Sequence, residues 1–307
     1  MTFGYYLFPD HARYFAAAAV LTFMAVNYFG VKKTANTTKA IVFIVLLVLL
    51  TIVGLTLKGN PSLDNLQPLI GSNGFYGILQ SAGIWFFAFA GYSRIATLGE
   101  EIKDPEKSIP RAIMIGLGLT LVVYAAVVMA ALSVVGPAVL SQSNAPLVTA
   151  VTEAGLGQWQ WLVKVGSTLA TLGVLLSLMT GISRTLFAMA ADRKLPLYLA
   201  KVHPIHKVPH RAEITVGLLL TVIVLLVDVR SAIGFSAFTV LLYYAVTNMS
   251  AYTLRASERL FSRKLAVLGF VSCLVLAFTL PIKSVIIGSL VMLFGVIVYS
   301  LQERAVR

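Results

Sequence analysis

Residues 40–57 read AIVFIVLLVLLTIVGLTL, a run that contains no charged side chain. A bilayer core about 30 Å thick is crossed by about 20 residues of α-helix, because each residue adds about 1.5 Å. Each Leu, Ile, Val or Phe favours insertion by about 0.5 kcal/mol, so this run is strongly favoured within lipid. Residues 40–57 therefore predict a transmembrane helix.

Apolar runs of this kind recur along the whole chain and predict about nine transmembrane helices. The runs are continuous rather than alternating with a period of two, which argues against membrane-spanning strands. The predicted spans are Tyr14–Gly30, Ala40–Leu57, Phe75–Leu98, Ala112–Val135, Val165–Ala190, Ile214–Val227, Ser231–Leu254, Leu265–Leu280 and Ser284–Leu301. We therefore expect an all-α polytopic membrane protein.

The composition supports this class and excludes others. Of the 307 residues, 58% are hydrophobic and only 12% are charged, whereas about a quarter of a soluble domain is charged. The chain has one cysteine, Cys273, which excludes a disulfide scaffold and a zinc–cysteine module. The net charge of +12 resembles that of a nucleic-acid-binding protein, but the basic residues lie between the apolar runs.

The distribution of these basic residues predicts the orientation of the chain. Alternate connections hold 17 of the Lys and Arg residues, and the opposite connections hold five, namely Arg13, Lys58, Lys164, Arg230 and Lys283. The positive-inside rule places the 17 in the cytoplasm. We therefore expect a plasma-membrane protein with its N-terminus outside and its C-terminus in the cytoplasm, and no nucleic-acid partner is needed to explain the charge. An odd number of spans that starts outside also fits a chain that lacks an odd number of leading helices.

The third predicted span combines aromatic residues with polar ones. Its aromatics surround Ala88, Ala90 and Gly91, and Arg94 follows. A transporter helix can unwind at mid-membrane and expose its backbone to a substrate, while a straight helix with packed aromatics is the simpler interpretation. Arg94 is costly within lipid and needs a partner or water. One interpretation is that Arg94 forms a structural ion pair with Glu100 or Glu101. The other is that these charged residues act as a gate.

The fifth predicted span has small residues on one face. They are spaced by three or four positions, at Gly166, Ala170, Gly173, Ser177 and Gly181, and Arg184 follows near the cytoplasmic end. Small residues allow helix backbones to approach closely. This face therefore indicates close helix packing, with the lining of a substrate path as the alternative.

Two further segments stand between predicted spans. His203, His206 and His210 resemble a metal site, but two prolines break the helix that would align them, and no carboxylate or cysteine adjoins. We therefore expect no metal, and no catalytic grouping or cofactor motif indicates an enzyme. Pro146–Ala154 predicts a short helix ended by Gly155, with a plain loop as the alternative.

Several of these stretches resemble one family. Residues 86–92 (FFAFAGY), 98–105 (LGEEIKDP) and 108–113 (SIPRAI) are similar to the sixth-helix signature of the amino acid–polyamine–organocation (APC) permeases. Residues 30–35 resemble the loop between that family's fourth and fifth helices. Residues 183–190 (SRTLFAMA), with Asp192 and Leu195-Pro196, resemble the end of its eighth helix. The matches occur in the same order and spacing over nearly the whole chain.

The resemblance implies a partial inverted-repeat, leucine-transporter-like fold in a single transmembrane domain, residues 1–307. The nine spans would correspond to helices four to twelve of a twelve-helix permease. Residues 14–57 would be the remnant of the first repeat, 75–254 the second five-helix repeat, and 265–301 a peripheral C-terminal pair. The family's Gly-rich first helix has no counterpart here, so the chain resembles a permease that lacks its first three helices.

The resemblance also implies a substrate site at the break around Gly91. Phe87 would be the aromatic gate, and the carbonyl groups of Phe87, Ala88 and Ala90 would receive the substrate's ammonium group. Tyr92 and Ser93 would shape the pocket, which Ser177 and Thr180 would face from a neighbouring helix. Arg94, Glu100, Glu101 and Arg184 would supply gating charges.

The implied function is transport of an amino acid or related amine by alternating access, as a secondary active transporter or exchanger. A proton or a counter-substrate is the expected coupling partner. Val45 occupies the position where some relatives have a proton-coupling lysine, so coupling by that route is not supported. The alternative is a non-transporting membrane remnant or scaffold, which the missing first helix favours; saturable substrate binding by this chain would exclude it.

Overall fold

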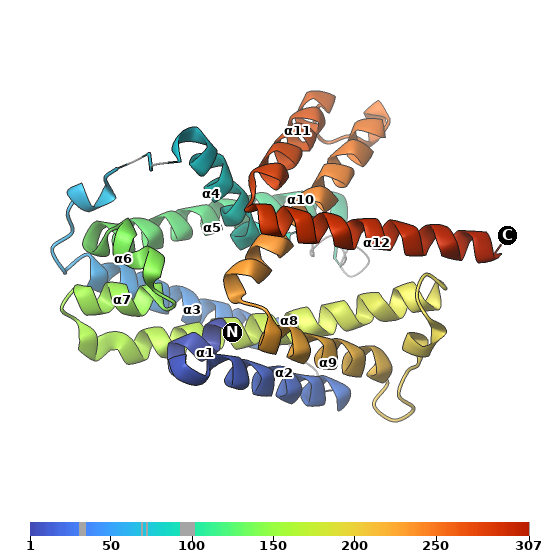
Figure 1. The fold of residues 1–307 in the computed structure, drawn as a ribbon, viewed down its shortest axis with the longest axis horizontal. Coiled ribbons are helices and arrows are strands. Elements are labelled where there is room, and N and C mark those ends of the chain that lie inside the picture. Colours follow the sequence, from blue (N-terminus) through green and yellow to red (C-terminus); the bar gives the residue numbers. More distant parts are fainter. Residues whose placement is uncertain (31–34, 69, 72, 93–101, 307) are drawn as a thin grey trace. The chain divides into compact units, whose positions relative to one another are not determined.

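The computed structural model describes residues 1–30, 35–68, 70–71, 73–92 and 102–306, and every element of regular structure in these residues is helical (Figure 1). The α-helices are α1 Thr2–Leu7, α2 Ala12–Tyr28, α3 Ala35–Thr56, α4 Gly74–Phe89, α5 Pro105–Val135, α6 Pro137–Gln142, α7 Pro146–Glu153, α8 Gln160–Ala191, α9 His210–Leu226, α10 Val229–Thr253, α11 Arg263–Thr279 and α12 Ile282–Val306. The expected all-α fold is therefore confirmed.

Each predicted span coincides with a helix, but the helices differ in length. Within the described residues, five are long and apolar enough to cross a membrane, at Thr38–Thr56, Pro105–Val135, Gly157–Ala191, Val229–Thr253 and Ile282–Ser300. The helices at the other four predicted spans are shorter: α2, α9 and α11 have 17 residues each, and α4 has 16. At 1.5 Å per residue these reach about 25 Å, somewhat less than the hydrocarbon core.

The described chain forms two compact units, and α5 contributes residues to both. The first unit comprises Met1–Gln67 and Val122–Val227, and the second comprises Pro68–Leu121 and Asp228–Arg307. Each unit is described by itself below. The division of the chain into a first-repeat remnant, a second repeat and a peripheral pair stays a prediction.

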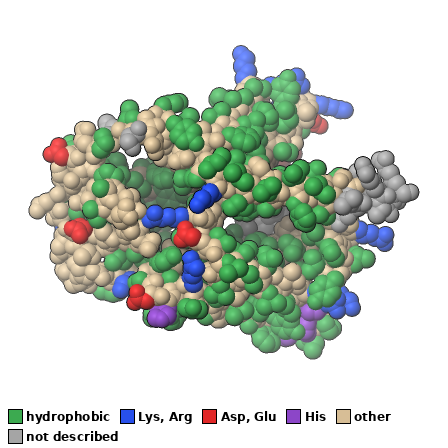
Figure 2. Space-filling model, in the orientation of Figure 1, with side chains coloured by type: hydrophobic (Ala, Val, Ile, Leu, Met, Phe, Trp, Pro, Cys, Tyr) green, Lys and Arg blue, Asp and Glu red, His purple; other side chains and the backbone are tan. Residues whose placement is uncertain are grey.

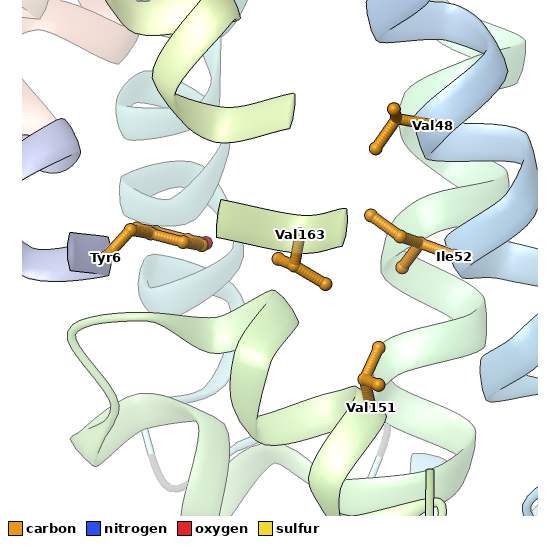
Figure 3. Packing of buried hydrophobic residues seen from close by; sticks show 5 residues of the cluster. All are labelled: Tyr6, Val48, Ile52, Val151 and Val163. Atoms are coloured by element: carbon orange, nitrogen blue, oxygen red, sulfur yellow. The ribbon is translucent and has the colours of Figure 1, made fainter. Parts of the chain in front are cut away.

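The first unit has a core at one end of α3 and α8 (Figure 3). Val48 and Ile52 from α3 and Val163 from α8 point toward one another, and Val151 from α7 and Tyr6 from α1 complete the cluster. Val151 and Val163 are no more than 1% exposed. The short helix expected from Pro146 is thus confirmed as α7, and it buries an apolar side chain against the longer helices.

Glycines let helices of the first unit approach closely. A side chain at Gly166 of α8 would overlap Val48 of α3, and one at Gly217 of α9 would overlap Met24 of α2. Gly173, two turns after Gly166, also faces α3, because a Cβ there would lie 3.5 Å from the Ile41 side chain. The small-residue face of α8 therefore serves close packing against α3 at these two positions.

The second unit is built around α10, which packs against α4, α11 and α12. Its core contains Phe238 and Leu241 of α10, both fully buried, with Ala277 of α11 and Leu280 just after it. Gly288 of α12 lies against the Phe238 ring, where a Cβ would overlap it. This ring therefore fills the space between α10 and its neighbours.

Both units expose large apolar side chains on their surfaces. Phe43 and Leu50 of α3 are each 67% exposed, and so is Phe294 of α12. Figure 2 shows hydrophobic side chains over much of the visible face and comparatively few charged ones. Such surfaces are costly in water and favourable in lipid, which identifies this chain as a membrane protein.

Candidate functional site

Helix α4 ends inside the predicted third span. Its last residue is Phe89, and Ala90 is extended, with φ −63° and ψ 139°. Gly91 follows with a backbone φ of +110°, a conformation that residues other than glycine rarely adopt. The chain therefore leaves the helix at the Gly91 motif that the sequence singled out.

Ala90 lies just beyond the last helical residue of α4, Phe89. The last carbonyls of any helix lack helical donors, and together they carry about half a negative charge. Here the Ala90 N–H donates to the Phe87 oxygen at 3.1 Å, which uses one of the two lone pairs of that oxygen. Phe87 can therefore accept a second donor, such as an ammonium group.

Aromatic rings fix this helix end within the second unit. Tyr244 of α10 lies 5.5 Å from both the Phe86 and the Tyr92 ring centroids, so it contacts the chain before and after the break. One turn earlier, Gly83 brings α4 against α11, where a Cβ would lie 3.0 Å from the Leu276 carbonyl.

Two predicted site residues retain accessible rings beside the break. Phe87 and Tyr92 are each 38% exposed, whereas Tyr244 behind them is buried. Among the described residues other than Ala90 and Tyr92, no heavy atom lies within 4 Å of the position that a Gly91 Cβ would occupy. The arrangement combines carbonyl dipoles with aromatic faces, both of which attract cations.

The remaining predicted site residues lie elsewhere. Ser93, Arg94, Glu100 and Glu101 fall outside the described residues. Ser177, Thr180 and Arg184 lie on α8 in the first unit, with Ser177 and Arg184 exposed and Thr180 partly buried. The structure thus groups Phe87, Ala88, Ala90, Gly91 and Tyr92 in one unit and the three α8 residues in the other.

A polar cluster in the first unit was not anticipated from the sequence. Glu213 of α9 is only 2% exposed, and Asn27 of α2 donates to its Oε2 at 3.4 Å. Thr180 donates to the Asn27 Oδ1 at 3.2 Å, and the Ser183 hydroxyl lies close to the Glu213 carboxyl. The available signals were an asparagine inside an apolar span and an acid directly before one.

The three loop histidines do come together, around an aromatic ring. The His203 ring centroid lies 4.7 Å from that of His206 and 5.3 Å from that of His210, and all three contact Tyr28. The His203 Nδ1 accepts the backbone N–H groups of Ile205 and His206, each at 3.2 Å. In the part of the chain that is described, no group of three His, Cys, Asp or Glu residues is arranged to hold a metal. The two hydrogen bonds accepted by His203 stabilise the local turn of the loop.

Comparison with known proteins gives a consistent result. A family model described as amino acid permease matches residues 1–305. An uncharacterized transporter of Mycobacterium tuberculosis is 46% identical over 308 residues, which cover all of this chain and 70% of the relative. The branched-chain amino acid permease BcaP of Bacillus subtilis is 30% identical over 64% of this chain and 42% of its own length. The human cationic amino acid transporter 4 is 33% identical over 59% of this chain and 28% of its own length.

Proposed function

Because the chain belongs to the amino acid permease family, we propose that it carries an amino acid or a related amine across the plasma membrane by alternating access. It would work as a secondary active transporter or exchanger, with a proton or a counter-substrate as the coupled species. The relatives support an amine-bearing substrate, since their names include a branched-chain amino acid permease and a cationic amino acid transporter. The predicted orientation, N-terminus outside and C-terminus cytoplasmic, is part of this proposal.

The end of α4 at Phe89 is the observation that carries the proposal. Transporters bind substrates where a spanning helix is interrupted, because freed carbonyls and a helix end then face a cavity instead of lipid. Here the interruption lies directly between the ring-bearing residues Phe87 and Tyr92. The substrate's ammonium group would bind to the carbonyl oxygens of Phe87, Ala88 and Ala90, and the Phe87 ring would cover it.

The other predicted residues have supporting roles in this scheme. Tyr92 and Ser93 would shape the pocket, and Ser177 and Thr180 on α8 stay predicted substrate-binding residues. Arg94, Glu100, Glu101 and Arg184 would supply gating charges. Charged groups at such positions tend to mark transport pathways, because their burial in lipid is costly unless they are paired.

The test is uptake of radiolabelled leucine and arginine by proteoliposomes that contain the 307-residue chain. We expect saturable uptake of at least one of them. Phe87→Ala should lower uptake about tenfold or more, the effect expected when about 1.4 kcal/mol of substrate interaction is lost. Phe75→Ala, at the opposite end of α4 and 72% exposed, is the matched control and should transport normally.

Two results would contradict the proposal. One is the absence of saturable uptake and of saturable binding for every amino acid and polyamine in a broader panel. The other is equal loss of uptake in the Phe87 and Phe75 variants, which would indicate general destabilisation of α4 rather than a binding role at its end.

A further inference from the structure

Glu213 is an acid buried among three packed helices of the first unit. It lies in the first turn of α9, which packs against α2, α8 and the short helix Leu197–Ala200. Its side chain is 2% exposed, while its neighbours Asn27 and Ser183 are 8% and 0% exposed. Ionisable groups buried within membrane proteins are costly to keep and tend to serve transport.

The partners of this carboxyl are mostly neutral. In the described part of the chain Glu213 forms no ion pair. Asn27 on α2 donates a hydrogen bond to it, and the Ser183 hydroxyl on α8 lies close to it. The charged group that acts on it from α8 is Arg184, which is exposed. On α9 itself His210 lies one turn earlier, and Arg211 is directed at the Tyr198 ring, 4.4 Å away. A carboxylate in these surroundings is only partly compensated.

The hydrogen-bond donors and acceptors around Glu213 suit its ionised and its protonated form differently. An ionised carboxyl only accepts, and the Ser183 hydroxyl has one hydrogen, which it donates to the Met179 carbonyl at 2.8 Å. Ser183 can therefore serve the ionised carboxyl only by giving up that bond. A protonated Glu213 can instead donate to the Ser183 oxygen while the Met179 bond is kept. Gain or loss of one proton thus rearranges contacts between α8 and α9.

The same network extends to a predicted substrate residue. Asn27 donates to Glu213 through its Nδ2 and accepts from Thr180 through its Oδ1. Thr180 also bonds its own helix, at the Leu176 carbonyl 2.9 Å away. A change at Glu213 can therefore reach Thr180 through a single intervening side chain, which links α9 to α8 by way of α2.

We infer that Glu213 is a proton-binding site of this protein, and that Asn27, Thr180 and Ser183 couple its protonation to transport. This inference rests on the proposed function for its coupling role. In each cycle the carboxylate takes one proton from water on one side of the membrane and releases it to the other side. The site is separate from residue 45, where the resemblance placed the coupling lysine of other permeases and where this chain has valine.

The experiment compares the wild-type chain with Glu213→Gln, which mimics the protonated form. The matched control is Glu153→Gln, which removes an exposed acid of α7 in the same unit. In proteoliposomes, an imposed difference of about one pH unit should raise wild-type leucine or arginine accumulation up to about tenfold for one proton per substrate. Glu213→Gln should abolish this stimulation and keep exchange of internal for external substrate. Glu153→Gln should behave as wild type.

A second readout does not depend on substrate. Infrared difference spectra between acidic and alkaline pH should contain the carboxyl band of a buried acid, and that band should disappear in Glu213→Gln but persist in Glu153→Gln. If the band persists in Glu213→Gln, the inference is overturned.

The outcomes separate this inference from the proposed function. Three results would overturn the coupling role of Glu213 and leave the transport function in place. Wild-type uptake could be independent of the pH gradient, it could depend on a sodium gradient instead, or Glu213→Gln could keep the pH dependence of the wild type. Absence of any wild-type uptake or binding overturns the proposed function. In that case the infrared band alone decides whether Glu213 binds a proton.

Discussion

Gly91 is the residue on which the geometry of the α4 end depends. Its φ of +110° is strained for any residue with a side chain, although the space beside it is open. We therefore predict that Gly91→Ala destabilises the second unit by about 1–3 kcal/mol through backbone conformation alone. It should also weaken substrate binding, because the carbonyls at the helix end would shift. Thermal unfolding in detergent and substrate binding would measure the two effects.

The control for this prediction is Gly116→Ala in α5. Gly116 has open space around it and no positive φ, so alanine should stabilise the helix there by about 0.5–1 kcal/mol. Equal stability of Gly91→Ala and Gly116→Ala would show that the φ at Gly91 does not constrain the protein.

Site residues that belong to a recognisable sequence motif could be predicted from the sequence. Site residues that are brought together only by the packing of distant helices could not. The aromatic run ending at Gly91 suggested an interruption as one of two interpretations, and α4 does end there, at Phe89. Asn27 and Glu213 are 186 positions apart and belong to no motif, and only the packing of α2 on α9 brings their side chains together. The roles predicted for Phe87, Tyr92 and the α8 residues stay predictions until transport is measured.

At the scale of helices, the Phe238 ring holds α10 against α11 and α12. It is fully buried, contacts Gly288 of α12, and lies edge-on to Phe278 at 5.9 Å. Apolar side chains are already favourably placed in lipid, so burial of the Phe238 ring gains little from the hydrophobic effect. The ring stabilises the helix packing through close van der Waals contacts. We predict that Phe238→Ala costs about 3 kcal/mol because it leaves a cavity between helices. Unfolding in mixed detergent would measure the loss.

Phe294→Ala provides the comparison for that prediction. Phe294 lies on α12 as well but is 67% exposed, so its removal leaves no cavity within the unit and should cost under about 1 kcal/mol. Similar losses for the two variants would mean that burial in the second unit does not determine its stability.

The apolar runs in the sequence predicted where the helices lie, but they predicted less accurately where each helix ends. Composition alone places the start of the third span near Phe75, where α4 begins one residue earlier. Its predicted end at Leu98 passed over the interruption at Ala90, because a single glycine among aromatic and aliphatic residues leaves the run apolar. The five-residue small face of α8 predicted close packing, and contacts at Gly166 and Gly173 identify α3 as the partner. The sequence could not supply that identity, since no pattern on α8 specifies its neighbour.

For the whole molecule, the sequence contains information about orientation that the structure does not. The fold determines which helices touch, whereas the side of the membrane follows from the distribution of Lys and Arg between connections. Cys273 is the single cysteine, so a Cys273→Ser background allows reporter cysteines to be placed at will. Leu63 and Ile205 are suitable sites because they are 78% and 77% exposed in loops of the first unit.

We predict that a membrane-impermeant maleimide added to intact cells labels Leu63→Cys and leaves Ile205→Cys unlabelled. Ile205 lies in the connection that holds Lys201, Lys207 and Arg211, whereas the connection around Leu63 has Lys58 as its basic residue. Moving such basic residues across a membrane opposes the bias that sets topology, so the loop around Ile205 should stay in the cytoplasm. Opening the cells should make Ile205→Cys reactive. Labelling of Ile205→Cys in intact cells would reverse the orientation of every span, and with it the side from which the proposed substrate and the Glu213 proton enter.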